Sequence, residues 1–238
     1  MNAFLQNRGV FVTGTDTGVG KTLVSEILVD LAVRAGRRTA VMKPVAAGCE
    51  ETADGPRNDD ALALIARSNI DVDYPTVNPY PLRPPVAPHI AAAKAGIEID
   101  PEVLDHAFAR LREVSDFVVV EGAGGFLVPL ASGFDIADLA VRWKLPLILV
   151  VGLRLGCLNH ALLSTEAIAA RGLGLAGWIG NRVDPGFVCV DENIATLRER
   201  ITAPCLGIVP YLGERTPLPG EHYIDLDLAR DGNPVATE

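Results

Sequence analysis

The chain has 238 residues, of which 49% are hydrophobic and 21% charged, a length and composition that suit one globular α/β domain. Its 21 basic and 30 acidic side chains give a formal net charge of −9, and a surface this acidic does not attract nucleic acid or anionic lipid, so neither is an expected partner. Four scattered cysteines, no signal peptide and a longest apolar run of nine residues (Leu145–Leu153), against the ~20 of a membrane span, predict a soluble cytoplasmic protein with reduced thiols.

Short apolar and β-branched runs recur along the chain and alternate with helical stretches, a pattern typical of βα units with a largely parallel central sheet and helices on both faces. Several of the runs are apolar without alternation, as in strands that are covered on both faces. The predicted strands are Val10–Thr13, Thr39–Met42, Phe117–Val120, Leu147–Val151, Ala176–Ile179 and Leu206–Val209.

Other segments connect or follow these strands. Apolar residues at helical spacing from Leu23 to Leu31 predict a helix after the first strand. Six prolines between Tyr74 and Pro88 predict an ordered loop. Asp100-Pro101-Glu102 is typical of a helix start and predicts a helix toward Val114. We expect a single domain over residues 1–238, with a frayed acidic and polar tail over residues 227–238.

The most informative segment runs from Gly14 to Thr22 and reads GTDTGVGKT, between the first strand and the first helix. Glycines there let backbone N–H groups and the helix N-terminus surround a phosphate. Lys21 would neutralise the β- and γ-phosphates, and the Thr22 hydroxyl would ligate magnesium. The alternative is a glycine-rich turn that only joins strand to helix, but Gly-Lys-Thr at a helix start after a buried strand favours a phosphate-binding loop (P-loop).

Three further polar positions suit such a site. Glu121 ends a strand before a glycine-rich turn, where a P-loop fold places a second magnesium-directing carboxylate; the alternative is an acid that only caps the strand. Lys43 follows the second strand at the sheet edge where ligands gather, although most lysines at strand ends are merely solvated. Asn58 or Asp59 could cap the next helix, which would leave Asp60 free to reach the metal.

Gly156-Cys157-Leu158-Asn159-His160 begins another helix directly after the Leu147–Val151 strand. Its free N–H groups could bind a carboxylate. From the residues alone, a helix start without a ligand is the stronger interpretation. His160 has no partner at catalytic spacing and is interpreted as structural.

Taken in order over residues 9–212, these segments resemble the dethiobiotin synthetase family. The matching motifs are Val12–Thr17, Val19–Thr22, Lys43–Val45, Arg57-Asn58 with Asp60-Ala61, Val120–Gly125, Leu155–Cys157 with Asn159-His160, Ala176–Trp178 with Asn181, and Pro210 with Leu212. Each motif alone is weak, but their joint order is highly specific.

The resemblance implies a single-domain P-loop NTPase-like α/β fold and a homodimer whose active site is shared across the interface. It implies an ATP-dependent cyclo-ligase of biotin biosynthesis, which forms the ureido ring of dethiobiotin from 7,8-diaminononanoate and CO2 and releases ADP and phosphate. Mg²⁺ is the implied cofactor and ATP the co-substrate.

The resemblance also assigns roles by position. It implies that Lys43, Lys21 and Thr17 are catalytic, and that Thr22, Asp60 and Glu121 hold magnesium. The implied nucleotide-binding residues are Gly18, Val19, Gly20, Lys21, Thr22, Leu23, Asp60, Glu121, Gly122, Ala123, Gly124, Asn181, Arg182, Pro210, Tyr211 and Leu212, with Asn181 reading adenine and Pro210–Leu212 closing over the base. The implied substrate-binding residues are Ala47, Gly156, Cys157 and Asn159, the last three receiving the substrate carboxylate from the neighbouring subunit.

Two positions depart from the family pattern. Ala47 stands where a hydroxyl residue often binds the substrate, and Arg182 stands where an acid can occur. Two other functions fit the sequence less well. A cobyrinate-type amidating synthetase needs a glutaminase domain, for which 238 residues leave no room. A ParA/MinD/ArsA-type ATPase switch carries a lysine five residues before Lys21, where this chain has Asp16.

Overall fold

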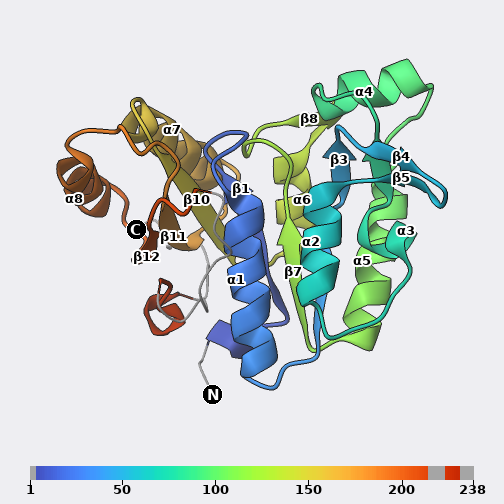
Figure 1. Cartoon of the computed structure of the whole chain (residues 1–238), viewed down its shortest axis with the longest axis horizontal. Coiled ribbons are helices and arrows are strands. Elements are labelled where there is room, and N and C mark those ends of the chain that lie inside the picture. Colours follow the sequence, from blue (N-terminus) through green and yellow to red (C-terminus); the bar gives the residue numbers. More distant parts are fainter. Residues whose placement is uncertain (1–3, 214–222, 231–238) are drawn as a thin grey trace.

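A parallel six-stranded sheet forms the centre of the molecule in the computed structural model, which describes residues 4–213 and 223–230 (Figure 1). The strand order is β12-β11-β10-β1-β7-β2, and each neighbouring pair is parallel. All six predicted strands are confirmed, some with longer bounds: β1 Gly9–Gly14, β2 Thr39–Met42, β7 Phe117–Glu121, β10 Leu147–Leu153, β11 Leu175–Arg182 and β12 Cys205–Val209. Because β1 lies inside the sheet, the loop that follows it reaches the middle of the carboxyl-end edge.

Helices cover both faces of this sheet, as predicted. They are α1 Lys21–Arg34, α2 Asp59–Arg67, α3 Tyr74–Val77, α4 Pro88–Ala95, α5 Pro101–Val114, α6 Ile136–Trp143, α7 Cys157–Ala170 and α8 Val190–Arg200, with short 3-10 helices at Phe4–Gln6 and Leu226–Leu228. Val10 and Val12 pack with apolar residues of α1 and α2 on one face. Phe11, between them, packs with α5 and α6 on the other face. This alternation along a fully buried strand explains why its sequence is apolar throughout.

In the described part of the chain, three pairs of short strands lie outside the main sheet. β3 (Val45–Ala47) pairs with β6 (Tyr80–Leu82), β4 (Glu50–Thr52) pairs with β5 (Gly55–Arg57), and β8 (Pro129–Ala131) pairs with β9 (Phe134–Asp135). The prediction of a loop between Tyr74 and Pro88 is therefore wrong where α3 and β6 lie. A proline in the first turn of α3 loses no helical hydrogen bond, and a proline in a two-stranded edge can face away from its neighbour.

The predicted helix start at Asp100 is confirmed, because its side chain accepts a hydrogen bond from Glu102 N at 2.8 Å. The frayed tail predicted from residue 227 is wrong for residues 227–230. Leu226–Leu228 form a 3-10 helix, and Arg230 N donates to Ala176 O at 2.9 Å. The remainder of that prediction, 231–238, lies outside the described residues. Within the described part of the chain, no helix has both the length and the apolar character needed to cross a membrane.

Candidate active site

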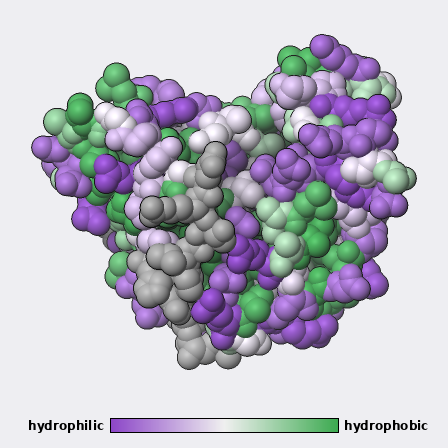
Figure 2. Space-filling view, in the orientation of Figure 1, coloured by the Kyte–Doolittle hydropathy of each residue, from purple (hydrophilic) through white to green (hydrophobic). Residues whose placement is uncertain are grey.

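A cavity of about 750 Å³ opens at the carboxyl-end edge of the sheet. Figure 2 shows the surface hollowed on this side, between the part that carries α7 and α8 and the part that carries α4. The loop after β1, the residues after β2 and the end of β7 all contribute to it. Its lining residues are Thr17, Gly18, Gly20, Lys21, Thr22, Lys43, Ala46, Ala47, Asn58, Asp60, Pro85, Val86, Ala87, Pro88, Glu121, Ala123, Gly124 and Val128.

The loop between β1 and α1 has the backbone of a phosphate-binding loop. Gly18 and Gly20 have φ angles of 70° and 87°, in the left-handed region that favours glycine. Gly20 also has no room for a side chain, because a Cβ there would lie 2.0 Å from Asn181 Nδ2. Lys21 is the first residue of α1 and is buried, with its Nζ donating to Asp16 O at 2.9 Å. The free N–H groups at the start of α1 can therefore face an anion in the cavity.

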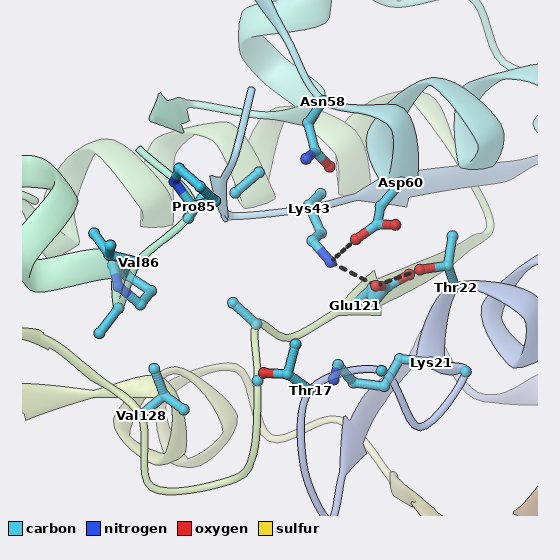
Figure 3. Close-up of a pocket in the computed structure, with 18 residues that line it drawn as sticks. Thr17, Lys21, Thr22, Lys43, Asn58, Asp60, Pro85, Val86, Glu121 and Val128 are labelled. Atoms are coloured by element: carbon cyan, nitrogen blue, oxygen red, sulfur yellow. Dashed lines mark hydrogen bonds and ion pairs between the residues drawn. The ribbon is translucent and has the colours of Figure 1, made fainter. Parts of the chain in front are cut away.

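Lys43 and Glu121 meet because β2 and β7 are neighbours with Met42 opposite Val120. Lys43 Nζ lies 2.5 Å from Glu121 Oε1 and 2.8 Å from Asp60 Oδ2 (Figure 3). The Thr22 hydroxyl donates to Glu121 Oε1 at 3.0 Å. Helix α2 supplies Asp60 because Asn58 serves as its N-cap, accepting from Ala61 N at 3.3 Å, as the sequence had allowed. One ammonium, two carboxylates and one hydroxyl thus share a single corner of the cavity.

The electrostatics of this corner follow from burial and from the opposed charges. Burial disfavours the charge of Lys43, but the attraction of Glu121 and Asp60 outweighs it, so the pKa of Lys43 is raised. Burial likewise opposes ionisation of Asp60, and the Lys43 charge reverses that effect, so the pKa of Asp60 is lowered. For Lys21, burial and then repulsion by Lys43 lower the pKa to about 8. The Lys21 ammonium therefore loses its proton at a lower pH than an ordinary lysine does.

Oxygen donors in this corner could hold a magnesium ion. Thr22 offers a hydroxyl, and Asp60 and Glu121 offer carboxylates. Glu121 is completely buried, yet its Oε2 atom has no hydrogen-bond partner. Among the described residues, no cluster of three His, Cys, Asp or Glu side chains could bind a metal, so a site here would depend on the hydroxyl. Mg²⁺ accepts such a set, since it takes few protein oxygens and retains water ligands.

The residues that are expected to contact the adenine base of ATP lie beside the cavity and do not form part of its wall. Asn181 and Arg182 end β11, and Asn181 is opposite Val209 at the end of β12, so residues 210–212 follow at the same edge. Asn181 Nδ2 donates to Val19 O at 3.0 Å, which joins this end of the sheet to the phosphate loop. Tyr211 is half exposed. Leu23 and Gly122 also lie outside the wall, whereas Ala123 and Gly124 belong to it.

The segment expected to bind the substrate carboxylate is also separate from the cavity. Gly156 is the N-cap of α7 with a φ of 94°, and Cys157 is buried beneath it. Gly156 and Asn159 are exposed, and none of the segment lines the cavity of its own chain. Leu155, just before it, is 90% exposed. In contrast, Ala47 at the end of β3 does line the cavity.

An apolar wall opposite the charged corner was missed at the sequence level. It consists of Pro85, Val86, Ala87, Pro88 and Val128, which approach from two distant parts of the chain. The proline-rich stretch was a signal for part of it, but nothing in the sequence connects that stretch with Val128. A cavity that is charged at one end and apolar at the other suits a ligand with an aliphatic chain beside a phosphate group.

Comparisons with known proteins agree with this geometry. A family model described as an AAA domain matches residues 8–217. The chain is 55% identical over 210 residues to the ATP-dependent dethiobiotin synthetase BioD of Aromatoleum aromaticum, covering 88% of this chain and 93% of the relative. It is 52% identical to the protein of that name from Pseudomonas aeruginosa over 217 residues, 91% of this chain and 95% of the relative.

Solved structures agree on the fold. The MinD cell division protein of Aquifex aeolicus matches with a TM-score of 0.51 and 19% identity over 86% of this chain and 82% of that chain. The MinC:MinD complex from Aquifex aeolicus gives a TM-score of 0.52 at 15% identity, over 86% of this chain and 81% of the matched chain. At such identities the similarity concerns the α/β P-loop architecture alone.

Proposed function

We infer the function from one premise: the chain belongs to the family of ATP-dependent dethiobiotin synthetases. It is an ATP-dependent cyclo-ligase that forms the ureido ring of dethiobiotin from 7,8-diaminononanoate and CO2, with release of ADP and phosphate, in biotin biosynthesis. The structural observation that best supports this function is the cavity. It is lined by a phosphate loop, a Lys43–Asp60–Glu121 cluster and an apolar wall.

The reaction has three steps. One amine of the substrate adds to CO2 and loses a proton, giving a carbamate. A carbamate oxygen then attacks the γ-phosphorus of ATP, ADP leaves, and a carbamic–phosphoric anhydride results. The second amine attacks the carbonyl carbon, phosphate leaves, and the ring closes with loss of a proton. None of these steps requires a covalent bond to the protein, so the enzyme acts by positioning the reactants and stabilising their charge.

Each catalytic residue has a role that follows from this chemistry. Lys21 binds the β- and γ-phosphates, and Thr17, at the cavity wall, donates to the transferred phosphoryl group or to the carbamate. Lys43 binds the carbamate oxygens and stabilises negative charge as the phosphoryl group moves. Thr22, Asp60 and Glu121 would hold magnesium, whose chemistry when bound is to neutralise phosphate charge. The unpartnered Glu121 Oε2 supports this assignment.

The nucleotide extends from the phosphate loop toward the end of β11. Residues Gly18–Leu23 and Gly122–Gly124 surround the phosphates, Asn181 and Arg182 meet adenine, and Pro210–Leu212 close over the base. The hydrogen bond from Asn181 to Val19 O supports this path, because it joins the residue proposed to contact adenine to the phosphate loop.

The substrate requires two subunits in this proposal. The apolar wall and Ala47 bind the aliphatic chain and the amines beside Lys43. The carboxylate is received at Gly156, Cys157 and Asn159 of the neighbouring subunit in a homodimer. The exposure of Gly156 and Asn159, and their absence from the cavity lining of their own chain, support this arrangement. The protein acts in the cytoplasm, without nucleic acid or membrane partners, in keeping with its net charge of −9.

Product analysis tests the proposal. The purified protein is incubated with 7,8-diaminononanoate, Mg-ATP and ¹³C-labelled bicarbonate, and the product is examined by mass spectrometry. We expect the label in the urea carbonyl and one ADP for each ring closed. A product without label, or ATP hydrolysis without ring closure, would refute the proposal.

A further inference from the structure

Arg154 reaches from the segment between β10 and α7 to the phosphate loop. Its Nη2 atom lies 2.6 Å from Asp16 Oδ2, although the two residues are 138 positions apart in the chain. Their side chains are 40% and 46% exposed. An ion pair of that exposure contributes little to overall stability, so its significance depends on what Asp16 itself positions.

Asp16 is at the centre of the loop's own contacts. Its Oδ1 atom accepts a hydrogen bond from Thr17 N at 2.7 Å, and its main-chain oxygen accepts from Lys21 Nζ at 2.9 Å. Movement of Asp16 would therefore displace the Thr17 amide and the Lys21 ammonium together. Both groups belong to the loop that binds the phosphates.

The end of β10 holds the loop at further points. Thr15 N donates to Val150 O at 3.0 Å. Gly152 lies so close to Val19 that a Cβ at residue 152 would be 2.8 Å from Val19 Cγ1. Since Cys157 N also donates to Arg154 O at 3.0 Å, the backbone of Arg154 is tied to the first residue of α7 while its side chain holds the loop.

We propose that Arg154 is a positioning residue for nucleotide binding. Through Asp16 it sets the Thr17 amide and Lys21 before the nucleotide arrives, and it neutralises a carboxylate that would otherwise repel the phosphates. This rests on the proposed function only in taking a nucleotide as the ligand of the loop.

The charge relationship makes the proposal specific. In Arg154→Met, Asp16 keeps its negative charge without a partner, and we expect the Kd for Mg-ADP to rise about fivefold, the effect of one partly exposed charge pair. Arg154→Lys keeps the charge and should recover most of the affinity. Adding Asp16→Asn to Arg154→Met removes the unpaired carboxylate, so the double variant should bind Mg-ADP better than Arg154→Met alone.

The experiment is isothermal titration calorimetry of Mg-ADP with the full chain and these variants, together with KM for ATP, kcat and melting temperature. Arg142→Met, which breaks an exposed pair with Asp105 away from the cavity, is the matched control and should leave the Kd unchanged. Titration with Mg-ADP reports on Arg154 even if no dethiobiotin is formed, so failure of this proposal is distinguishable from failure of the proposed function.

The proposal is supported if Arg154→Met raises both the Kd for Mg-ADP and the KM for ATP while kcat stays nearly unchanged. The double variant must also recover affinity for Mg-ADP. A Kd within twofold of wild type in Arg154→Met would overturn the proposal. So would a lower kcat at unchanged KM, because Arg154 would then act on the reaction itself. If Arg154→Met lowered the melting temperature but left the Kd for Mg-ADP unchanged, the Arg154–Asp16 pair would be a structural contact only.

Discussion

Lys43 and Glu121 are 78 residues apart in the chain, yet their side chains form the shortest cation–carboxylate contact described around the cavity, 2.5 Å between Nζ and Oε1. Both are buried, with side-chain exposures of 5% and 0%. The parallel pairing of β2 with β7 produces this contact, since the residue after Met42 and the residue after Val120 fall at the same level of the sheet.

Lys43→Met should lower both turnover and stability. Loss of a charge that stabilises the transition state reduces kcat about a hundredfold. Removal of one partner also leaves Glu121 charged and buried, which costs about 3 kcal/mol in unfolding free energy. Steady-state kinetics and urea denaturation measure the two effects. Lys94→Met on the exposed face of α4 is the control and should change neither. Turnover within threefold of wild type in Lys43→Met would exclude a catalytic role for this lysine.

Nucleotide binding should take up a proton at Lys21 in mildly alkaline solution. Because burial and Lys43 lower the pKa of Lys21 to about 8, this lysine is largely neutral above that pH in the free protein. Phosphate charge raises the pKa again, so the lysine is protonated in the complex. Well below pH 8 it is charged in both states and takes up almost no proton, whereas above pH 8 affinity falls as pH rises.

Calorimetry of Mg-ADP binding at about pH 9, in two buffers of different ionisation enthalpy, measures this uptake. Lys21→Arg is the matched variant, because guanidinium stays charged in both states. Equal proton uptake by wild type and Lys21→Arg would assign the proton to another group.

Ala47→Ser should tighten binding of the diamine. Ala47 lines the cavity at the end of β3, at a position where the family resemblance implies that a hydroxyl residue often binds the substrate. One added neutral hydrogen bond contributes about 1 kcal/mol, or a few-fold in Kd. Titration of 7,8-diaminononanoate into both proteins provides the measurement. An unchanged or weaker Kd would mean that the substrate does not approach residue 47.

Two inactive variants should restore activity when mixed, if the site is shared across a dimer. Lys21→Ala disables the phosphate loop, and Asn159→Trp obstructs the start of α7. In a mixed dimer one site carries both changes and the other carries neither. Random pairing of equal amounts makes about half of the dimers mixed, so activity should approach roughly a quarter of wild type. With subunit exchange verified by mass spectrometry, activity near zero would show that each chain builds its own site.

The sequence predicted the parts of the fold that depend on local pattern. The run Val10–Thr13 is apolar because both faces of β1 are covered, and that pattern identifies a buried strand without knowledge of its neighbours. The order of the strands depends on long-range pairing and could not be obtained in this way. Between Tyr74 and Pro88, proline content obscured α3 and β6, since prolines are tolerated in a first helical turn and in an edge pairing.

The candidate site also has parts that a local sequence pattern predicts and parts that depend on contacts between distant residues. The phosphate-binding loop could be predicted from the motif GTDTGVGKT alone, because this one contiguous segment supplies the glycines, the lysine and the hydroxyl. Lys43 could be placed only by resemblance, since its partners Asp60 and Glu121 come from other elements. Neither Val128 in the apolar wall nor Arg154 beside Asp16 had a local signal. These contacts exist only after separate βα units have assembled.

The contact between Gly20 and Asn181 restricts the order in which this sequence can change over evolutionary time. A Cβ at residue 20 would lie 2.0 Å from Asn181 Nδ2, so even alanine collides there while asparagine is present. A lineage could therefore vary residue 20 only after the side chain of residue 181 had moved or become smaller, and the φ of 87° would still disfavour any residue but glycine there. That first step would sacrifice the hydrogen bond to Val19 O before any benefit appeared. Selection should thus hold the two positions together as a linked pair, although 160 residues separate them in the gene.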